Sequence, residues 1–542
     1  MDFKFLLTYE KNEKTVTAQS SNNDVEVIVD KTENGLSYTL NSKSNIKLLR
    51  AELKGKYEFS SNDKFFANGF QSWTDTKEFS KNEKMPDKGF VAKTPVGKKM
   101  GLQYVGDYMY ADYSKNPGVF HGNSYCYINK GDKIDFYGSL TDRTGWTVFE
   151  ADMNKNKFRI YKDVEGVNVT GEYKLFEIYT DSGEYNEVFD HYFNAMGIKP
   201  LTDKKIKGYT SWYNYYQNIN EEVILRDLEA LSKKADGLID TFQIDDGYQV
   251  AVGEWLNINK KKFPNGMKPI ADAIHSKGLQ AGIWLAPLGV QHNSSIVKEH
   301  PDWLVRNKKG KLFYVGGNWG GFYALDIYNQ EVRDYIYHFF DVVLNEWGFD
   351  LVKLDFLYAA AVLPRNGKSR GEIMYDAMDL IRDAVGDKKI LGCGVPMMPC
   401  FGVTEYMRIG ADMALQWEDS KSRKKMHRED VSTVNAIYNS IYRRHLNGRA
   451  FLCDPDVFLL RDYNIKFSFT ERKLLAKFIK IFGSVIFTSD DVSRYNEDQL
   501  ACLKDTLSPD EAQLVSVDVK DGFCKIVYTE NGSQQKLEFK IN

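Results

Sequence analysis

From residue 208 to about residue 490, short apolar segments alternate with amphipathic helical segments. The first repeats read YTSWYN (209–214), EEVILRDLEALSKKA (221–235), TFQIDD (241–246), MKPIADAIHSKG (267–278) and LQAGIWLAP (279–287). Repeated strand-then-helix units predict a parallel sheet. Five further strands are predicted at DLVKLDF (350–356), KKILGCG (388–394), MRIGAD (407–412), AFLCDPD (450–456) and SVIFTSD (484–490). Eight such strands match the size of a (β/α)₈ barrel, which we assign to residues 201–492.

The sequence on either side of this region has the period of two that is typical of antiparallel strands. Before residue 200 it appears in DVEVIVD (24–30), KIDFYGSL (133–140) and KFRIYKD (157–163). After residue 493 it returns in QLVSVDVK, FCKIVYT and KLEFKI. The sequence therefore predicts a multidomain α/β plus β protein: an N-terminal β-sandwich (1–200), the barrel and a small C-terminal antiparallel β domain (493–542).

Composition excludes several classes of function. The 72 Lys and Arg residues nearly balance the 75 Asp and Glu residues, giving a net charge of −3, so no field attracts nucleic acid or an anionic membrane. We find no apolar run of bilayer-spanning length, and the start MDFKFLLTYEKNEK lacks a secretory hydrophobic region, so we expect a cytoplasmic protein. The six cysteines form no C-x-x-C pair, which fits neither a disulfide framework nor a zinc site.

Acidic and aromatic residues finish the predicted barrel strands, where the active sites of such barrels lie. They are Trp212, Tyr213, Asp245, Asp246, Trp284, Lys353, Asp355, Cys393, Gly394, Asp412, Asp454, Asp456, Asp490 and Asp491. Such a ring can hold a sugar or a hard metal ion. None of the 8 histidines finishes a predicted strand, and Trp212 and Trp284 suit the apolar face of a pyranose. We therefore favour a sugar over a metal.

Two pairs of charged residues are candidates for catalysis. Lys353 and Asp355 are two residues apart and share one face of the fourth strand, so the ammonium can keep Asp355 ionised as a nucleophile. Arg408 and Asp412 fall on one side of the sixth extended segment, which makes Asp412 the natural second carboxylate. The alternatives are an ion pair that fills the barrel end and an arginine–aspartate pair at the surface.

Other motifs carry weaker signals. Asp245-Asp246-Gly247 also makes an ordinary turn, but its position at a strand end favours hydrogen bonds to sugar hydroxyls. The glycine-rich segment VGGNWGG (315–321) lacks phosphate-loop spacing, and GCGVPM (392–397) does not complete a dinucleotide-binding motif. The chain has no G-x-S-x-G elbow. Serine-hydrolase and dinucleotide functions therefore lose support.

Six motifs occur in one order along the chain: FANGFQSW (66–73), YTSWYNYY (209–216), FQIDDGYQ (242–249), GIWLAP (282–287), KLDF (353–356) and MRIGAD (407–412). Together they resemble the α-galactosidases of glycoside hydrolase family 36, most strongly between residues 205 and 490. The resemblance implies an N-terminal β-sandwich, a catalytic barrel and a C-terminal β domain. It also implies hydrolysis of terminal α-linked galactose with retention of configuration, without a cofactor.

Carried over by position, the resemblance implies a role for each candidate residue. Asp355 would be the nucleophile and Asp412 the general acid/base. Asp245 and Asp246 would hold the O4 and O6 hydroxyls of galactose, and Lys353 and Arg408 other ring hydroxyls. The remaining candidates are the pocket tryptophans Trp212 and Trp284, Trp73 reaching over from the N-terminal domain, and Cys393 and Gly394 near the sugar's C2.

The chain departs from the resemblance in the segment GCGVPMMPC (392–400), where many larger members carry a longer glycine run. Because this segment is expected near C2, α-N-acetylgalactosaminidase is the first alternative. Transglycosylation with the same carboxylates is the second, and a catalytically silent galactoside-binding protein is the third. The sequence leaves open the natural substrate, the linkage and the oligomeric state.

Overall fold

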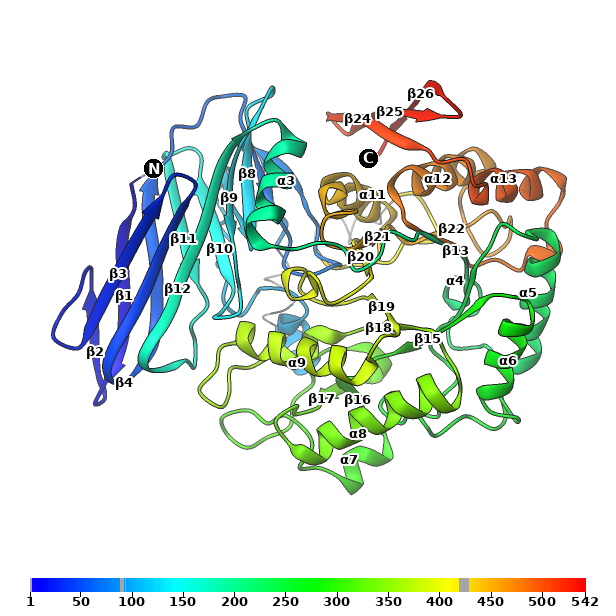
Figure 1. Ribbon diagram of the computed structural model, residues 1–542, viewed down its shortest axis with the longest axis horizontal. Helices are drawn as coiled ribbons and strands as arrows, with labels where there is room; N and C mark the ends of the chain where they lie inside the picture. The colour runs from blue at the N-terminus through cyan, green and yellow to red at the C-terminus, as the bar shows by residue number, and fades with distance from the viewer. Residues whose placement is uncertain (1, 88–91, 93, 419–427) are drawn as a thin grey trace.

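The computed structural model describes residues 2–87, 92, 94–418 and 428–542. Along the chain, an antiparallel sheet is followed by a curled parallel sheet and then by a small antiparallel sheet. In Figure 1 the first sheet stands beside the barrel and the last one lies along the barrel's edge. This arrangement confirms the predicted fold class.

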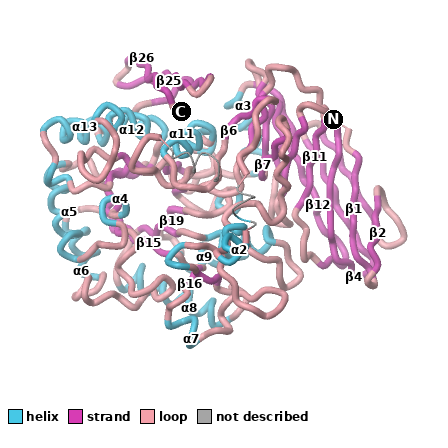
Figure 2. Tube along the Cα trace, turned by 180° about the vertical axis from the view of Figure 1, so that it is seen from behind, coloured by secondary structure: helices cyan, strands magenta, loops and turns pink. Residues whose placement is uncertain are grey.

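In the described part of the chain, the N-terminal sheet has twelve strands joined by continuous hydrogen bonding. They are β1 (Lys4–Lys11), β2 (Lys14–Ala18), β3 (Val25–Thr32), β4 (Gly35–Lys56), β5 (Lys64–Ala67), β6 (Lys77–Ser80), β7 (Val119–Asn123), β8 (Tyr125–Asn129), β9 (Ile134–Ser139), β10 (Thr147–Asp152), β11 (Lys157–Lys162) and β12 (Asn168–Gly183). The long strand β4 pairs with β3 and β12 along one half and with β1 and β11 along the other. Bulges where β4 pairs with β1 and with β12 let these strands bend over a shared apolar core, and Figure 2 shows β1, β4, β11 and β12 side by side.

Two connections from this sheet matter for the site. Between β6 and β7 lie the short helices α2 (Pro95–Lys99) and η1 (Leu102–Tyr104). Helix α3 (Tyr185–Met196) leads from β12 toward the barrel; the Glu184 carboxylate caps its first turn, and Gly197, at φ 67°, ends it. Phe189 of α3 stacks on His445 with ring centroids 3.8 Å apart. The predicted boundary at residue 200 falls in the loop after this helix.

The central sheet is parallel throughout and closes on itself through its seventh strand. Its strands are β13 (Ile206–Thr210), β14 (Thr241–Ile244), β15 (Gln280–Leu285), β18 (Leu351–Leu354), β19 (Lys389–Gly392), β20 (Tyr406–Arg408), β21 (Leu452–Asp454), β22 (Val457–Phe458) and β23 (Val485–Thr488). Pro455 and Asp456 interrupt the predicted seventh strand, because proline has no N–H to donate to a ladder. Its first part, β21, pairs with β20, and its second part, β22, pairs with β23.

Amphipathic helices cover the outside of the barrel. They include α5 (Glu221–Lys234), α6 (Lys268–Ser276), α8 (Gln330–Asp341), α9 (Arg370–Val385), α11 (Thr433–Tyr442) and α12 (Phe469–Phe482). Capping boxes at Ser369 and Ser468 start α9 and α12. The first predicted strand ends earlier than expected: Trp212, predicted near its end, begins the short helix α4 (Trp212–Tyr215).

The loop between β15 and β18 is long and carries an antiparallel pair of its own. Strand β16 (Gly289–Gln291) pairs with β17 (Phe322–Ala324), and helix α7 (Ser295–Glu299) and the turn η2 (Asn318–Gly320) lie between them. Trp319 in this turn has φ 53°, a left-handed conformation that is uncommon for a bulky residue.

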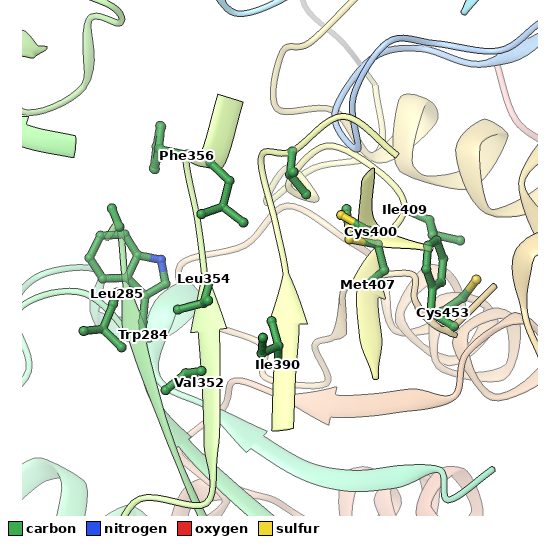
Figure 3. Packing of buried hydrophobic residues seen from close by; sticks show 14 of the residues in the cluster. Trp284, Leu285, Val352, Leu354, Phe356, Ile390, Cys400, Met407, Ile409 and Cys453 are labelled. Carbon is green, nitrogen blue, oxygen red and sulfur yellow. The ribbon is translucent and has the colours of Figure 1, made fainter. Parts of the chain in front are cut away.

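Period-two alternation separates two cores in the barrel. Inside it, Ile206, Leu351, Leu391, Tyr406, Leu452, Val485 and Phe487 form one apolar cluster. Their neighbours Val352, Leu354, Ile390 and Met407 belong to the core between strands and helices, part of which Figure 3 shows. Side chains two and four residues after an interior residue therefore also point into the barrel, nearer to the carboxyl ends of its strands. Lys353 and Asp355 have these positions after Leu351.

The C-terminal segment begins with a helix that the sequence analysis did not predict. Helix α13 (Glu497–Leu507) starts with a capping box between Asn496 and Gln499, and strands β24 (Gln513–Lys520), β25 (Phe523–Glu530) and β26 (Ser533–Lys540) follow it. The buried pair of Lys480 and Glu530, 2.7 Å apart, ties this sheet to α12. Every helix in the described residues is too short or too polar to span a bilayer.

Candidate active site

A cavity of about 260 Å³ lies at the carboxyl ends of the barrel strands. Its lining consists of Trp73, Leu102, Val105, Trp212, Asp245, Asp246, Trp284, Gly317, Asn318, Trp319, Lys353, Asp355, Phe356, Asp412, Glu429, Asp430 and Val431. Eight of the predicted site residues are among them: Trp73, Trp212, Asp245, Asp246, Trp284, Lys353, Asp355 and Asp412. The structure thus brings together side chains from the sheet domain and from β14, β15, β18 and the segment after β20.

Asp355 follows β18 and is held by neutral donors. The Trp284 indole Nε1–H donates to its Oδ2 at 3.2 Å, and the Phe356 backbone N–H donates to its Oδ1 at 2.8 Å. Phe356 has φ 54°, which turns the chain sharply after the carboxylate. Burial raises the pKa of Asp355, while the charge of Lys353 opposes the rise. Trp284 therefore orients this carboxylate as well as lining the cavity.

Lys353 and Asp245 form a buried ion pair, with 2.8 Å between Nζ and Oδ2. Burial alone would raise the pKa of Asp245, but the charge and hydrogen bond of Lys353, together with hydrogen bonds from the Asp246 N–H and the Gln243 amide, outweigh burial and the pKa is lowered. Burial is the strongest single influence on Lys353 and lowers its pKa, but the acidic groups around it, Asp245 first among them, together outweigh burial and the pKa is raised. Both shifts favour the charged pair. The direct partner of Lys353 is thus Asp245, and Lys353 acts on Asp355 only through its charge.

Asp246 accepts hydrogen bonds from three neutral side chains. The Gln217 amide donates at 2.7 Å and the Trp319 indole at 3.0 Å, both to Oδ2, while the Gln249 amide donates to Oδ1 at 2.5 Å. Burial raises the pKa of this carboxyl, and the three donors oppose the rise. Adjacent residues of a straight strand point to opposite sides. Because Asp245 and Asp246 both line the cavity, the chain must bend after β14.

Asp412 lies on the other side of the cavity and pairs with a cation. Arg408 Nη1 donates to its Oδ1 at 2.9 Å, and the Asp412 side chain is 33% exposed. The Arg408 guanidinium also reaches Asp454 at 3.0 Å and Asp456 at 2.9 Å, and it is almost fully buried. Arg408 was predicted to bind a ring hydroxyl, but it is not part of the cavity lining and contacts Asp412 from behind.

A loop of the sheet domain holds Trp73 over the barrel mouth. The Ser72 N–H donates to Val395 O at 3.1 Å, and the Gly394 N–H donates to Ser72 Oγ at 2.9 Å. The buried Arg443 side chain donates to four carbonyl oxygens, those of Gly69, Gln71, Ser72 and Ile409. These contacts fix the sheet domain to the ends of β19 and β20, which supports the predicted position of Trp73.

Cys393 and Gly394, predicted near C2 of a sugar, lie behind the cavity wall. Gly394 has φ 56°, and a β-carbon there would stand 2.7 Å from Trp73 Cζ2 and 2.9 Å from Asp355 Oδ1. Only glycine fits so close an approach. The Cys393 thiol is buried, which raises its pKa. This segment packs tightly against the back of Asp355.

Sequence reasoning missed Trp319 and the two glutamines that hold Asp246. The segment VGGNWGG was tested only for phosphate-loop spacing, although a tryptophan flanked by glycines between the third and fourth strands lies on the active-site side of a barrel. Leu102, Val105 and the stretch 429–431 were missed as well, because they come from distant parts of the chain. Their local sequences carry no sugar-binding signal.

Two further observations concern other sites. A larger cavity of about 530 Å³ lies by the C-terminal sheet, lined by Trp417, Tyr438 and Lys540 among others, but none of the predicted site residues borders it. Among the residues that the structure describes, no three or more His, Cys, Asp or Glu side chains are grouped as a metal site.

Sequence comparisons identify relatives for part of the chain. The Melibiase family model matches residues 175–371. α-Galactosidase Mel36A of Lactobacillus acidophilus is 32% identical over 153 residues, which are 27% of this chain and 20% of that protein. An Escherichia coli α-galactosidase is 28% identical over 190 residues, 32% of this chain and 25% of that protein. The match thus spans a quarter or less of these curated relatives.

Structural similarity extends over nearly the whole chain. TtGalA, an α-galactosidase from Thermus thermophilus solved with p-nitrophenyl α-D-galactopyranoside, superposes with a TM-score of 0.73 at 23% identity, covering 98% of both chains. The family 36 α-galactosidase AgaA from Geobacillus stearothermophilus gives 0.62 at 12% identity, covering 97% of this chain and 79% of that one. These findings confirm the resemblance to the α-galactosidases of glycoside hydrolase family 36 and the shared fold.

Proposed function

We propose that this protein is a retaining α-galactosidase that removes terminal α-linked galactose from oligosaccharides or glycoconjugates. The observation that carries the proposal is the convergence of Asp355 and Asp412 on one cavity from different strand ends. Two carboxyl groups that flank a glycosidic bond are what glycoside hydrolysis requires. The names of the relatives support galactose as the sugar.

In the first step an Asp355 carboxylate oxygen bonds to the anomeric carbon while the bond from that carbon to the leaving oxygen breaks. The leaving oxygen takes the proton of Asp412, so the aglycone departs neutral. In the second step Asp412 accepts a proton from water, the water oxygen bonds to the anomeric carbon, and Asp355 is released. Two displacements at one carbon restore its original configuration.

The surroundings of each carboxyl suit these roles. Asp355 is oriented by Trp284 and the Phe356 N–H, which leaves it little freedom to rotate. The Lys353 charge favours its ionised form against burial. Asp412 is a third exposed, so both a leaving group and a water molecule have access to it.

The opposite wall supplies acceptors for sugar hydroxyls. Asp245 and Asp246 both border the cavity, and hydroxyl groups that donate to buried carboxylates form strong hydrogen bonds. We assign O4 and O6 of galactose to these two acids, as the family resemblance implies. The indole faces of Trp73, Trp212 and Trp284 provide apolar surface for the C–H side of the ring.

Release of p-nitrophenol from paired α-galactoside and α-N-acetylgalactosaminide substrates tests the proposal. The wild-type chain should cleave the galactoside, and Asp355→Ala should abolish that activity. Proton NMR of the first product formed should show α-galactose before it mutarotates. Cleavage of the N-acetyl sugar alone would refute galactose as the substrate, and initial release of β-galactose would refute retention.

A further inference from the structure

Arg408, Asp412, Asp454 and Asp456 form a charge cluster at the ends of β20 and β21. The Arg408 guanidinium contacts three carboxylates: Nη1 reaches Asp412 at 2.9 Å, Nε reaches Asp454 at 3.0 Å, and Nη2 reaches Asp456 at 2.9 Å. The side chains of Asp454 and Asp456 are 4% and 0% exposed. Three acids thus share one cation, and the reaction as described uses only one of them.

The fold forces Asp456 into this cluster. It follows Pro455 at the break in the seventh strand and has φ 89°, a left-handed conformation that is costly for aspartate. The Tyr213 hydroxyl and the Met413 N–H both donate to its Oδ2. Its Oδ1 faces Arg408 Nη2 without a well-aligned hydrogen bond. Backbone strain and burial of an acid both lower the stability of the protein, and residues that combine them are often functional.

We propose that Asp456 is a positioning residue for the general acid/base Asp412, acting through Arg408. This inference rests on the proposed function. With Asp454 on Nε and Asp456 on Nη2, the planar guanidinium has one orientation left, and that orientation presents Nη1 to Asp412. The two buried acids thus fix Arg408 from one side, and Arg408 in turn orients the Asp412 carboxyl group.

Four charged or titratable groups act on Asp456 most strongly. Burial raises the pKa of Asp456; Arg408 and the Tyr213 hydroxyl oppose the rise, and the charges of Asp412 and Asp454 add to it. Beyond the cluster, Cys393 and Lys353 lie within electrostatic range of Arg408 and Asp355. Removing the Asp456 charge takes one of three carboxylates from Arg408 and so weakens what fixes the orientation of the guanidinium toward Asp412.

Asp456→Asn tests the proposal with two substrates. In 2,4-dinitrophenyl α-galactoside the leaving group departs as a stable phenolate and needs no proton. In methyl α-galactoside the leaving group is an alcohol and requires a proton from Asp412. We expect kcat/KM for methyl α-galactoside to fall about 10- to 100-fold, and that for the aryl substrate to fall much less.

A matched control lies at the end of β23. There Arg461 pairs with buried Asp490 at 2.5 Å, and the Tyr495 hydroxyl donates to the same carboxylate at 2.6 Å. This cluster resembles the Asp456 cluster in composition but does not contact Asp412. Asp490→Asn should leave the ratio of the two substrates' kcat/KM values unchanged.

The outcomes separate the possible failures. An equal loss of kcat/KM on both substrates would overturn the positioning role of Asp456. If Asp456→Asn does not fold, Tyr213→Phe removes a donor to the same carboxylate, and an unchanged substrate ratio in that variant overturns the proposal. If the wild-type protein cleaves neither galactoside, the proposed function fails and this inference fails with it.

Discussion

On the β14 and β18 side of the cavity, Lys353 pairs with a single carboxylate, Asp245, whereas on the β20 and β21 side Arg408 is shared by three carboxylates. On the first side the charges of Lys353 and Asp245 pair with each other, and the other two acids, Asp355 and Asp246, receive hydrogen bonds from neutral donors. On the second side no carboxyl group has a cation to itself, and Asp412 is bound directly to Arg408.

The difference matches two chemical requirements. A nucleophile benefits from a fixed orientation in a dry pocket, and Asp355 is 8% exposed. A group that exchanges protons with a leaving group and then with water needs access to solvent, and the Asp412 side chain is 33% exposed. The two sides therefore differ in whether the carboxylate is held by neutral or by charged groups.

The largest expected effect comes from replacing each of these acids in turn. Asp355→Asn should lower kcat/KM by about 10⁴-fold or more on every α-galactoside, because no covalent intermediate forms. Asp412→Asn should lower it about 10²- to 10⁴-fold on methyl α-galactoside but far less on the dinitrophenyl substrate, because only the first needs a general acid. Steady-state kinetics with both substrates measures the contrast, and equal leaving-group dependence in the two variants would contradict the assigned roles.

Breaking the balanced pair should cost stability. Lys353→Met leaves Asp245 charged and buried without its partner, and loss of one partner from a buried pair typically costs about 3–5 kcal/mol. The double variant Lys353→Met/Asp245→Asn should recover most of that loss, since no isolated charge remains. Urea unfolding of the four members of this cycle measures the coupling.

The pair of Lys480 and Glu530 is the control for this cycle. It is equally buried and 2.7 Å apart, but it lies at the C-terminal sheet, and Lys477, 2.9 Å from Glu530, remains as a second partner when Lys480 is replaced. Lys480→Met should therefore destabilise the protein while leaving KM for galactosides unchanged, whereas Lys353→Met should affect both quantities. Additive losses in the Lys353 and Asp245 cycle would show that the pair is not coupled.

Much of the barrel could be predicted from the sequence because its signals are local. Alternation of strand and helix patterns located the eight strands, and period-two facing placed Asp355 two residues after Lys353 on the interior side. The break of the seventh strand was not predicted, although Pro455 stands within the segment. A proline inside a predicted strand lacks the N–H that the ladder needs, and this is the local signal for the break.

The partners of the site residues could not be predicted in the same way. Strand facing puts Lys353 on the same side as Asp355, but which carboxylate its ammonium reaches depends on how β14 and β18 lie around the barrel. Arg408 was read together with Asp412 alone, because Asp454 and Asp456 belong to a strand more than forty residues later. Contacts between distant segments decide these pairings.

The hydrogen bonds that neutral donors make to Asp246 can be probed at Trp319. Trp319→Phe keeps an aromatic face toward the cavity but removes the indole donor to Asp246, 3.0 Å away. Since a hydrogen bond to a charged group contributes about 1.5–3 kcal/mol, we expect KM for galactosides to rise about tenfold or more, with a smaller change in kcat.

Trp303 provides the matched substitution for Trp319. Its indole donates to the Glu331 carboxylate at 2.8 Å, outside the cavity. Trp303→Phe should leave KM unchanged while removing the same kind of hydrogen bond. A KM unchanged in Trp319→Phe as well would show that the orientation of Asp246 does not limit sugar binding.

The smallest expected effect concerns the stability cost of Asp355. Its pKa is raised by burial above the ordinary value of 3.8, so the folded state prefers the protonated form and loses stability as pH rises through the folded-state pKa. Asp355→Asn, which cannot ionise, should unfold a few degrees above the wild-type protein at pH 7. The difference in unfolding temperature between the two proteins should shrink as pH falls and vanish below the pKa of Asp355 in the unfolded state. Thermal unfolding of both proteins across this range measures it, and an advantage that grows toward acid would mean that Lys353 and the Trp284 indole outweigh burial at this carboxyl.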